Sequence, residues 1–108
     1  MKKNLLFILA VCICQLLLAQ SPRKVLVEHF TQASCGPCAS TNPIIHPILE
    51  RNKSRLVLLT HQTSWPGVDP MNADNPGEVA TRVAYYGVTG VPDTKMGGQD
   101  GGQSPTQL

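Results

Sequence analysis

The sequence lacks the patterns that mark several common functional classes. No second C-x-x-C pair and no H-x-x-x-H pair accompanies Cys35 and Cys38, although a structural zinc site needs four ligands. Basic residues form no stripe that could release counterions from phosphates, so nucleic acid is not an implied partner. At 108 residues the chain is also too short for more than one domain. These absences disfavour a zinc module and a nucleic-acid-binding protein.

A long apolar run is also missing. The apolar stretch over residues 5–18 is shorter than the ~20 residues that a transmembrane helix needs. Because it follows two lysines, the sequence predicts a signal peptide over residues 1–20, with cleavage after Ala19 or Gln20. We therefore expect an exported protein, in the periplasm, at the outer membrane or secreted, with no membrane span after cleavage. An uncleaved anchor is the alternative.

Signal cleavage leaves one cysteine pair, in the sequence C-G-P-C at residues 35–38. Cys12 and Cys14 lie inside the signal peptide. Val11 and Ile13 precede them where lipoprotein processing requires a small residue, which disfavours lipidation. The remaining chain carries seven basic and seven acidic side chains once the two N-terminal lysines are removed.

Cys35 and Cys38 are predicted to lie where a strand meets a helix. A β-rich run over residues 24–30 ends just before them, and helical spacing begins after them. A thiol in the first turn of a helix faces unpaired N–H groups and the positive end of the helix dipole. Such a position lowers a cysteine pKa from about 8.5 to roughly 3.5–7.5. Cys35 is therefore the expected nucleophile and Cys38 the resolving thiol, with an inert structural disulfide as the alternative.

The first half of the mature chain predicts a strand, a helix and a second strand. The strand over residues 24–30 has two faces, with Val25, Val27 and His29 on one and Leu26, Glu28 and Phe30 on the other. The helix after the cysteines has an apolar stripe that consists of Ile44, Ile45, Ile48 and Leu49. Pro43 and Pro47 should bend or split this helix. Residues 55–61 form a nearly continuous apolar run, which is typical of a central strand buried on both faces.

The second half predicts a long loop, another helix and a tail. Trp65, within the loop over residues 62–75, either fills the loop's own core or covers a substrate groove. The following helix starts at Asn75 and stops at Gly87. Its apolar stripe consists of Val79, Ala80, Val83 and Ala84. Residues 93–96 are a weak strand candidate, and the glycine-rich segment over residues 97–108 indicates a tail.

This order of elements resembles the thioredoxin-like superfamily over roughly residues 24–98. Three features carry the resemblance: C-G-P-C at residues 35–38, Pro43 five residues later, and Y-G-V-T-G-V-P at residues 86–92. The export signal and the W-P-G-V-D-P loop make the chain similar to the secreted, outer-membrane-associated branch. The implied fold is a thioredoxin-like βαβα core over residues 21–98. The hydrophobic hairpin and closing helix of the family are lacking, and residues 99–108 form a Gly-rich tail.

The resemblance also implies roles for residues outside the cysteine pair. Pro92 should follow a cis peptide bond and face the disulfide, and the backbone of Val91 should pair with a bound substrate. The family has a buried aspartate six residues before the first cysteine as proton acceptor. That position is His29 here, and Glu28 is adjacent, so either could relay the proton of Cys38, although a histidine or glutamate at a strand end is more often solvated.

Two further positions complete the sequence comparison. Ser34 stands where the family has a tryptophan, which removes part of the usual substrate-facing surface. His46 and His61 are expected to be surface or packing residues.

We therefore expect an exported thiol–disulfide oxidoreductase that uses Cys35 and Cys38 and needs no cofactor or metal. Its partners would be protein thiols and disulfides together with an unidentified electron-transfer partner. One alternative is a non-catalytic binding module with the same fold. Another is a copper-handling protein, because soft thiolates suit Cu(I).

Overall fold

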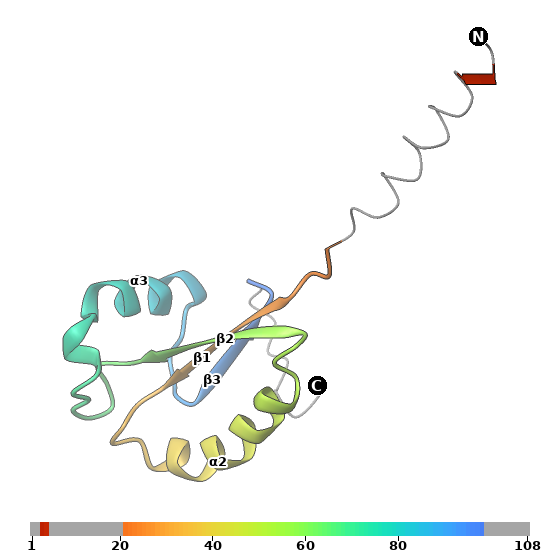
Figure 1. The fold of residues 1–108 in the computed structure, drawn as a ribbon. Coiled ribbons are helices and arrows are strands. Elements are labelled where there is room, and N and C mark those ends of the chain that lie inside the picture. The colour runs from red at the N-terminus through yellow and green to blue at the C-terminus, as the bar shows by residue number, and fades with distance from the viewer. Residues whose placement is uncertain (1–2, 5–20, 99–108) are drawn as a thin grey trace.

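A three-stranded mixed sheet between two helices forms the α/β domain in the computed structural model (Figure 1). The structure describes residues 3–4 and 21–98, so almost all of the predicted signal peptide and the tail over residues 99–108 lie outside the described residues. The elements that position the site are β1 (Val25–Thr31), α2 (Gly36–Arg51), β2 (Leu56–Gln62), η1 (Asn72–Asp74), α3 (Pro76–Tyr86) and β3 (Asp93–Met96). No helix within the described ranges is both long and apolar enough to cross a membrane.

Strand β1 lies at the centre of the sheet, whose order is β2-β1-β3. It pairs in parallel with β2 and antiparallel with β3. The prediction that residues 55–61 form a central strand is wrong, because β2 lies at an edge and leaves Val57 50% and Leu59 43% exposed. An apolar run indicates a strand but does not show how many neighbours it has. The weak strand candidate over residues 93–96 is a strand, and it takes the place on the other side of β1.

Helix α2 runs without interruption over 16 residues, with Pro43 and Pro47 inside it. Both prolines are exposed and lie four residues apart on one face, so the hydrogen bonds that they remove are on the solvent side. The helix bends but does not split (Figure 1). Ile45 and Leu49 are buried as predicted, whereas Ile44 is 59% exposed and does not belong to the buried stripe.

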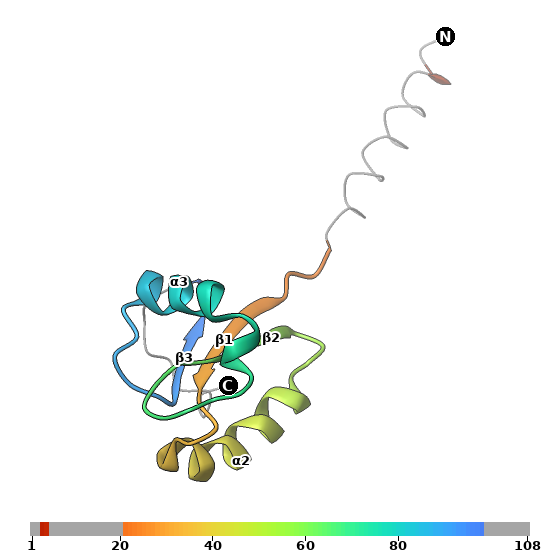
Figure 2. The ribbon, with the colours of Figure 1, turned by 90° about the vertical axis from the view of Figure 1, so that its left-hand side faces the viewer.

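The two helices cover opposite faces of the sheet (Figure 2). On the α2 side the buried apolar residues are Val27, Ile45, Leu49 and Leu56. On the α3 side they are Phe30, Tyr86 and Val88, with Trp65, Val83 and Val91 packed against them. The predicted alternation of β1 is therefore confirmed. Trp65 packs into the core on the α3 side and not into a core of its own loop.

Helix α3 starts after Asn75 and ends at Gly87, as predicted. Gly87 has a φ of 60°, a left-handed conformation in which glycine has no side chain to clash. The Asn75 amide donates to the Glu78 carboxylate at 2.8 Å and does not cap the helix with its side chain. Ala80 and Ala84 of the predicted stripe are exposed, so the buried face of α3 is narrower than its sequence suggests.

Candidate redox site at the start of α2

Cys35 and Cys38 form a disulfide at the point where the loop after β1 enters α2. Cys35 is the N-cap residue, with extended backbone angles (φ −84°, ψ 111°), and Cys38 lies in the first turn of the helix. The predicted strand-to-helix junction is confirmed. It places the first sulfur at the helix end where backbone N–H groups lack intrahelical acceptors.

The sulfur of Cys35 has a hydrogen-bond donor and a backbone carbonyl beside it. The Cys38 N–H donates to Cys35 Sγ over 3.1 Å. The Val91 carbonyl oxygen lies 3.5 Å from the same sulfur, and the Val91–Pro92 peptide is cis, as predicted. A hydrogen bond to the charged form of a group favours that form, so the Cys38 N–H would stabilise a thiolate at Cys35 after reduction.

Both cysteines are buried in the disulfide form: Cys35 is 3% exposed and Cys38 1%. Exposure therefore does not distinguish the two sulfurs. The difference between them lies in the N-cap position of Cys35 and in the hydrogen bond that its Sγ accepts.

Part of the long loop after β2 is docked against the residues that precede Cys35. Asp69 is 6% exposed, and its Oδ2 accepts the Ala33 N–H at 2.9 Å. The Ser34 hydroxyl donates to the Val68 carbonyl at 2.7 Å. A Cβ added at Gly67 would lie only 2.8 Å from the Ser34 Cβ, so the two loops approach each other closely. Sequence reasoning missed these contacts, and the only signal for them was the cluster of turn residues in the loop.

His29 is fully buried on the α2 side of the sheet, so the expectation of a solvated histidine is wrong. Its Nε2 lies 3.0 Å from Asn42 Oδ1 and its Nδ1 lies 2.9 Å from Thr94 Oγ1. Because the amide oxygen can only accept, Nε2 carries the proton and the Thr94 hydroxyl donates to Nδ1. Burial lowers the pKa of His29, although the hydrogen bond to Asn42 acts in the opposite direction. His29 is thus a neutral link between β1, α2 and β3.

Glu28 is also buried, at 1% exposure, and it faces α3 on the other side of the sheet. Its Oε1 accepts from His61 Nε2 at 3.0 Å and forms an ion pair with Arg82, whose Nε lies 3.2 Å away; its Oε2 accepts from the Tyr86 hydroxyl. Burial acts to raise the pKa of Glu28, but the hydrogen bonds from Tyr86 and His61 and the charge of Arg82 outweigh it and lower the pKa. Burial and the bond to Glu28 raise the pKa of Tyr86 to about 12, so this hydroxyl stays a donor.

The predicted relay residues therefore occupy different surroundings. His29 shares a sheet face with α2, which carries Cys38, whereas Glu28 contacts α3 residues on the opposite face. The ring nitrogens of His29 and the carboxylate oxygens of Glu28 all have partners other than the two cysteines. The relay role stays a prediction.

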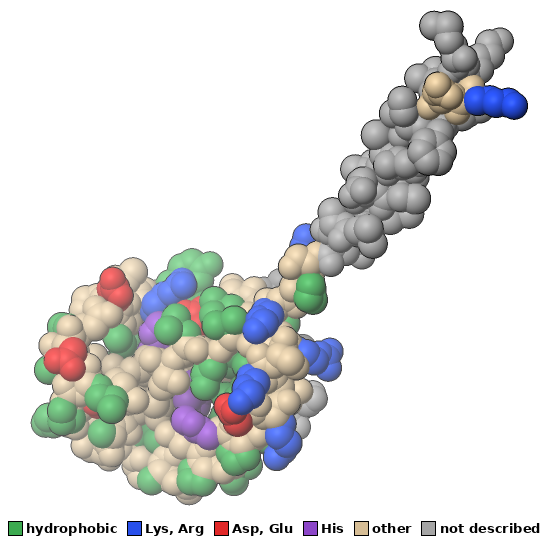
Figure 3. Space-filling view, in the orientation of Figure 1, with side chains coloured by type: hydrophobic (Ala, Val, Ile, Leu, Met, Phe, Trp, Pro, Cys, Tyr) green, Lys and Arg blue, Asp and Glu red, His purple; other side chains and the backbone are tan. Residues whose placement is uncertain are grey.

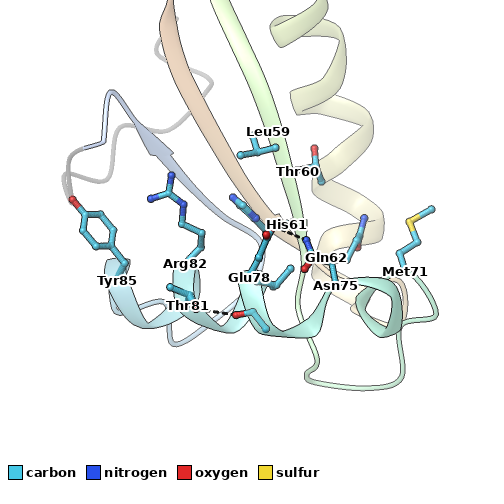
Figure 4. Close-up of a pocket in the computed structure, with 12 residues that line it drawn as sticks. Leu59, Thr60, His61, Gln62, Met71, Asn75, Glu78, Thr81, Arg82 and Tyr85 are labelled. Atoms are coloured by element: carbon cyan, nitrogen blue, oxygen red, sulfur yellow. Dashed lines mark hydrogen bonds between the residues drawn. The ribbon is translucent and has the colours of Figure 1, made fainter.

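A cleft of about 820 Å³ lies between β2 and α3, apart from the cysteine pair. Leu59, Thr60, His61 and Gln62 line it from the strand, and Glu78, Thr81, Arg82 and Tyr85 line it from the helix (Figure 4). His61 and Arg82 thus reach the cleft, while their shared partner Glu28 is buried behind them.

Most of the visible basic side chains of the domain lie on the side where the chain enters β1 (Figure 3). In the sequence, five basic residues precede β1 or lie between the end of α2 and the start of β2: Arg23, Lys24, Arg51, Lys53 and Arg55. That end of α2 is about 24 Å from Cys35 at 1.5 Å per helical residue. The groups next to Cys35 Sγ are therefore a backbone N–H and a backbone carbonyl, and not these cations.

Comparison with known proteins adds no relative to these observations: no family model matches the chain, and neither does any curated protein sequence. Within residues 3–4 and 21–98, no three or more histidine, cysteine, aspartate or glutamate side chains gather in a way that could hold a metal ion.

Proposed function

We propose that this protein is an exported thiol–disulfide oxidoreductase that acts through Cys35 and Cys38. The observation that carries the proposal is the environment of Cys35 Sγ, which accepts the Cys38 N–H at 3.1 Å and lies 3.5 Å from the Val91 carbonyl. A sulfur held at a helix N-terminus is suited to leave a disulfide as a thiolate and to attack one as a nucleophile. The adjacent backbone of Val91 offers a carbonyl next to the reacting atom.

The proposed reaction transfers two electrons and two protons from a dithiol to a disulfide. In the reducing direction the Cys35 thiolate attacks a substrate disulfide, which breaks the substrate S–S bond and forms a mixed disulfide. The departing substrate thiolate takes up a proton. Cys38 then loses its proton and attacks Cys35 Sγ, which releases the second substrate thiol and forms the Cys35–Cys38 disulfide. A second dithiol, the electron-transfer partner, reduces this disulfide by the same steps.

We assign the chain to a thioredoxin-like architecture within this proposal. Support comes from C-G-P-C between a strand and a helix, from the sheet order β2-β1-β3 and from the Y-G-V-T-G-V-P segment that leads into β3. In such an architecture Val91 and Pro92 form the substrate-facing turn opposite the disulfide.

The redox equilibrium of the cysteine pair tests the oxidoreductase proposal. In buffers of reduced and oxidised glutathione or dithiothreitol, we expect a reversible two-electron couple at about −120 to −270 mV, the range of dithiol oxidoreductases. The reduced protein should also cleave the disulfides of insulin. A pair that stays oxidised below about −300 mV and leaves insulin intact would identify a structural disulfide and favour the binding-module alternative.

Export is the second part of the proposal, and it rests on the sequence of residues 1–20. Mass spectrometry of the protein from its native host should find a mature N-terminus at Gln20 or Ser21. A full-length cytoplasmic species would contradict the assigned compartment.

A further inference from the structure

Two loops are joined by hydrogen bonds just before Cys35, in a contact that we call the clamp. The first loop, residues 32–34, joins β1 to α2, and the second loop, residues 63–71, follows β2. Asp69 joins the loops through Oδ2, which accepts the Ala33 N–H two residues before the reactive cysteine. Its other oxygen accepts the Met71 N–H at 2.9 Å, so the carboxylate also fixes the shape of its own loop.

The clamp is a specific contact, because it combines a buried carboxylate, several hydrogen bonds and a close approach of the two loops. Asp69 is 6% exposed although it is charged, and buried carboxylates need hydrogen bonds to offset the loss of water. Hydrogen bonds to an ionised acceptor are roughly twice as strong as those between neutral groups. Ser34 adds a second link to the same loop through the Val68 carbonyl, and the absence of a side chain at Gly67 permits the close approach.

We infer that Asp69 is a positioning residue for the redox site. By holding the Ala33 backbone, it fixes the turn that brings Cys35 to the N-terminus of α2, where the Cys38 N–H reaches its sulfur. The inference rests on the proposed function, because it concerns the reactivity of Cys35. It adds a residue that belongs to neither the C-G-P-C motif nor the turn at Val91 and Pro92.

Asp69→Ala in the full chain tests the inference. Loss of the clamp should let the turn before Cys35 shift, and a displacement of about 1 Å at a reacting group can cost up to ~100-fold in rate. We expect insulin reduction to slow by about tenfold or more. The midpoint of the pH profile for alkylation of Cys35 should move to higher pH, because the Cys38 N–H then stabilises the thiolate less. Asp69→Asn keeps one amide oxygen as an acceptor. It should therefore retain part of the wild-type reduction rate and show a smaller shift of the alkylation profile than Asp69→Ala.

Gly67→Ala displaces the same contact by a different route. The added Cβ would clash with Ser34, so this variant keeps the carboxylate and should still slow exchange and shift the alkylation profile in the same direction. Two control variants should behave like the wild type in insulin reduction and in the pH profile of Cys35 alkylation. Asp74→Ala removes an exposed aspartate from the same connection, and Gly77→Ala adds a Cβ where no atom lies within 4 Å.

A thermal melt of each variant separates positioning from stability. If Asp69→Ala fails to fold, Gly67→Ala and Asp69→Asn carry the test. Wild-type rates and profiles in folded Asp69→Ala or Gly67→Ala protein, even with a lower Tm, would show that the clamp is only a structural contact. Wild-type protein that neither reduces insulin nor shows an activated Cys35 would instead overturn the proposed function itself.

Discussion

Replacing Cys38 with serine is expected to trap a covalent adduct between Cys35 and a substrate cysteine. Cys35 can still attack a disulfide in this variant, but no second thiol remains to break the mixed disulfide that forms. The adduct should accumulate to a large fraction of the protein and should disappear on treatment with dithiothreitol. Non-reducing electrophoresis followed by mass spectrometry measures it.

Replacing Cys35 with serine should instead prevent formation of the adduct. Cys35→Ser removes the sulfur that accepts the Cys38 N–H, so we expect no exchange with insulin and no adduct. In the reduced wild-type protein, Cys35 should be alkylated well below pH 8.5, the ordinary cysteine pKa, whereas Cys38 should react slowly. Peptide mass spectrometry after timed alkylation measures the rate for each thiol separately. The control is Ser40→Ala, a substitution at an exposed position one turn after Pro37, which should leave both rates unchanged.

The alternatives predict different patterns for the same two variants. At a copper site, both substitutions would weaken ion binding to a similar extent and neither would trap a partner. With a structural disulfide, both would lower stability and the oxidised pair would resist reduction. Equal alkylation of the two thiols, with no adduct from folded Cys38→Ser, would leave a binding module as the better explanation.

The second large effect is expected at Glu28. Glu28→Ala would leave the Tyr86 hydroxyl and His61 without their acceptor inside the domain, and it would open a cavity next to β1. Arg82 can turn toward water, because its side chain is 40% exposed. A buried donor left without its acceptor costs about 1–3 kcal/mol and the cavity adds to this, so a large part of the stability of a domain this small should be lost. Urea unfolding of the two proteins measures the difference.

The matched control is Glu50→Ala, which removes an exposed glutamate that pairs with exposed Lys53. Exposed pairs of this kind contribute little, so its unfolding curve should stay close to that of the wild type. Similar curves for Glu28→Ala and wild type would mean that the buried cluster does not stabilise the fold.

The pH dependence gives an independent check of the Glu28 cluster. Because the pKa of Glu28 is lowered from 4.5 in the folded protein, its ionised form contributes stability above pH 4.5. This contribution is lost as the pH falls through the lowered folded value. Glu28→Gln lacks the titrating group, so its stability should fall less steeply below pH 4.5 than that of the wild type. Parallel curves would contradict the lowered pKa.

The sequence was sufficient for features that depend on neighbours along the chain. The junction at Cys35, the alternating faces of β1 and the ends of α3 at Asn75 and Gly87 were all predicted correctly. Each depends on local periodicity, on a residue that suits a helix end, or on the i, i+2 alternation of a strand. The resemblance to the thioredoxin-like superfamily added the expectation of a cis peptide before Pro92, which the structure has.

Tertiary structure decided which side chains are buried and which segments meet. The apolar run of β2 did not reveal that β1 has two strand neighbours, and a histidine and a glutamate near a strand end did not reveal that both are buried. Glu28 and Tyr86 are 58 residues apart, and Ala33 and Asp69 are 36 apart. Burial and hydrogen bonding over such separations depend on how the sheet and helices pack together. The cysteine pair itself is therefore encoded by four consecutive residues, whereas the contacts next to it form only when distant segments fold against each other.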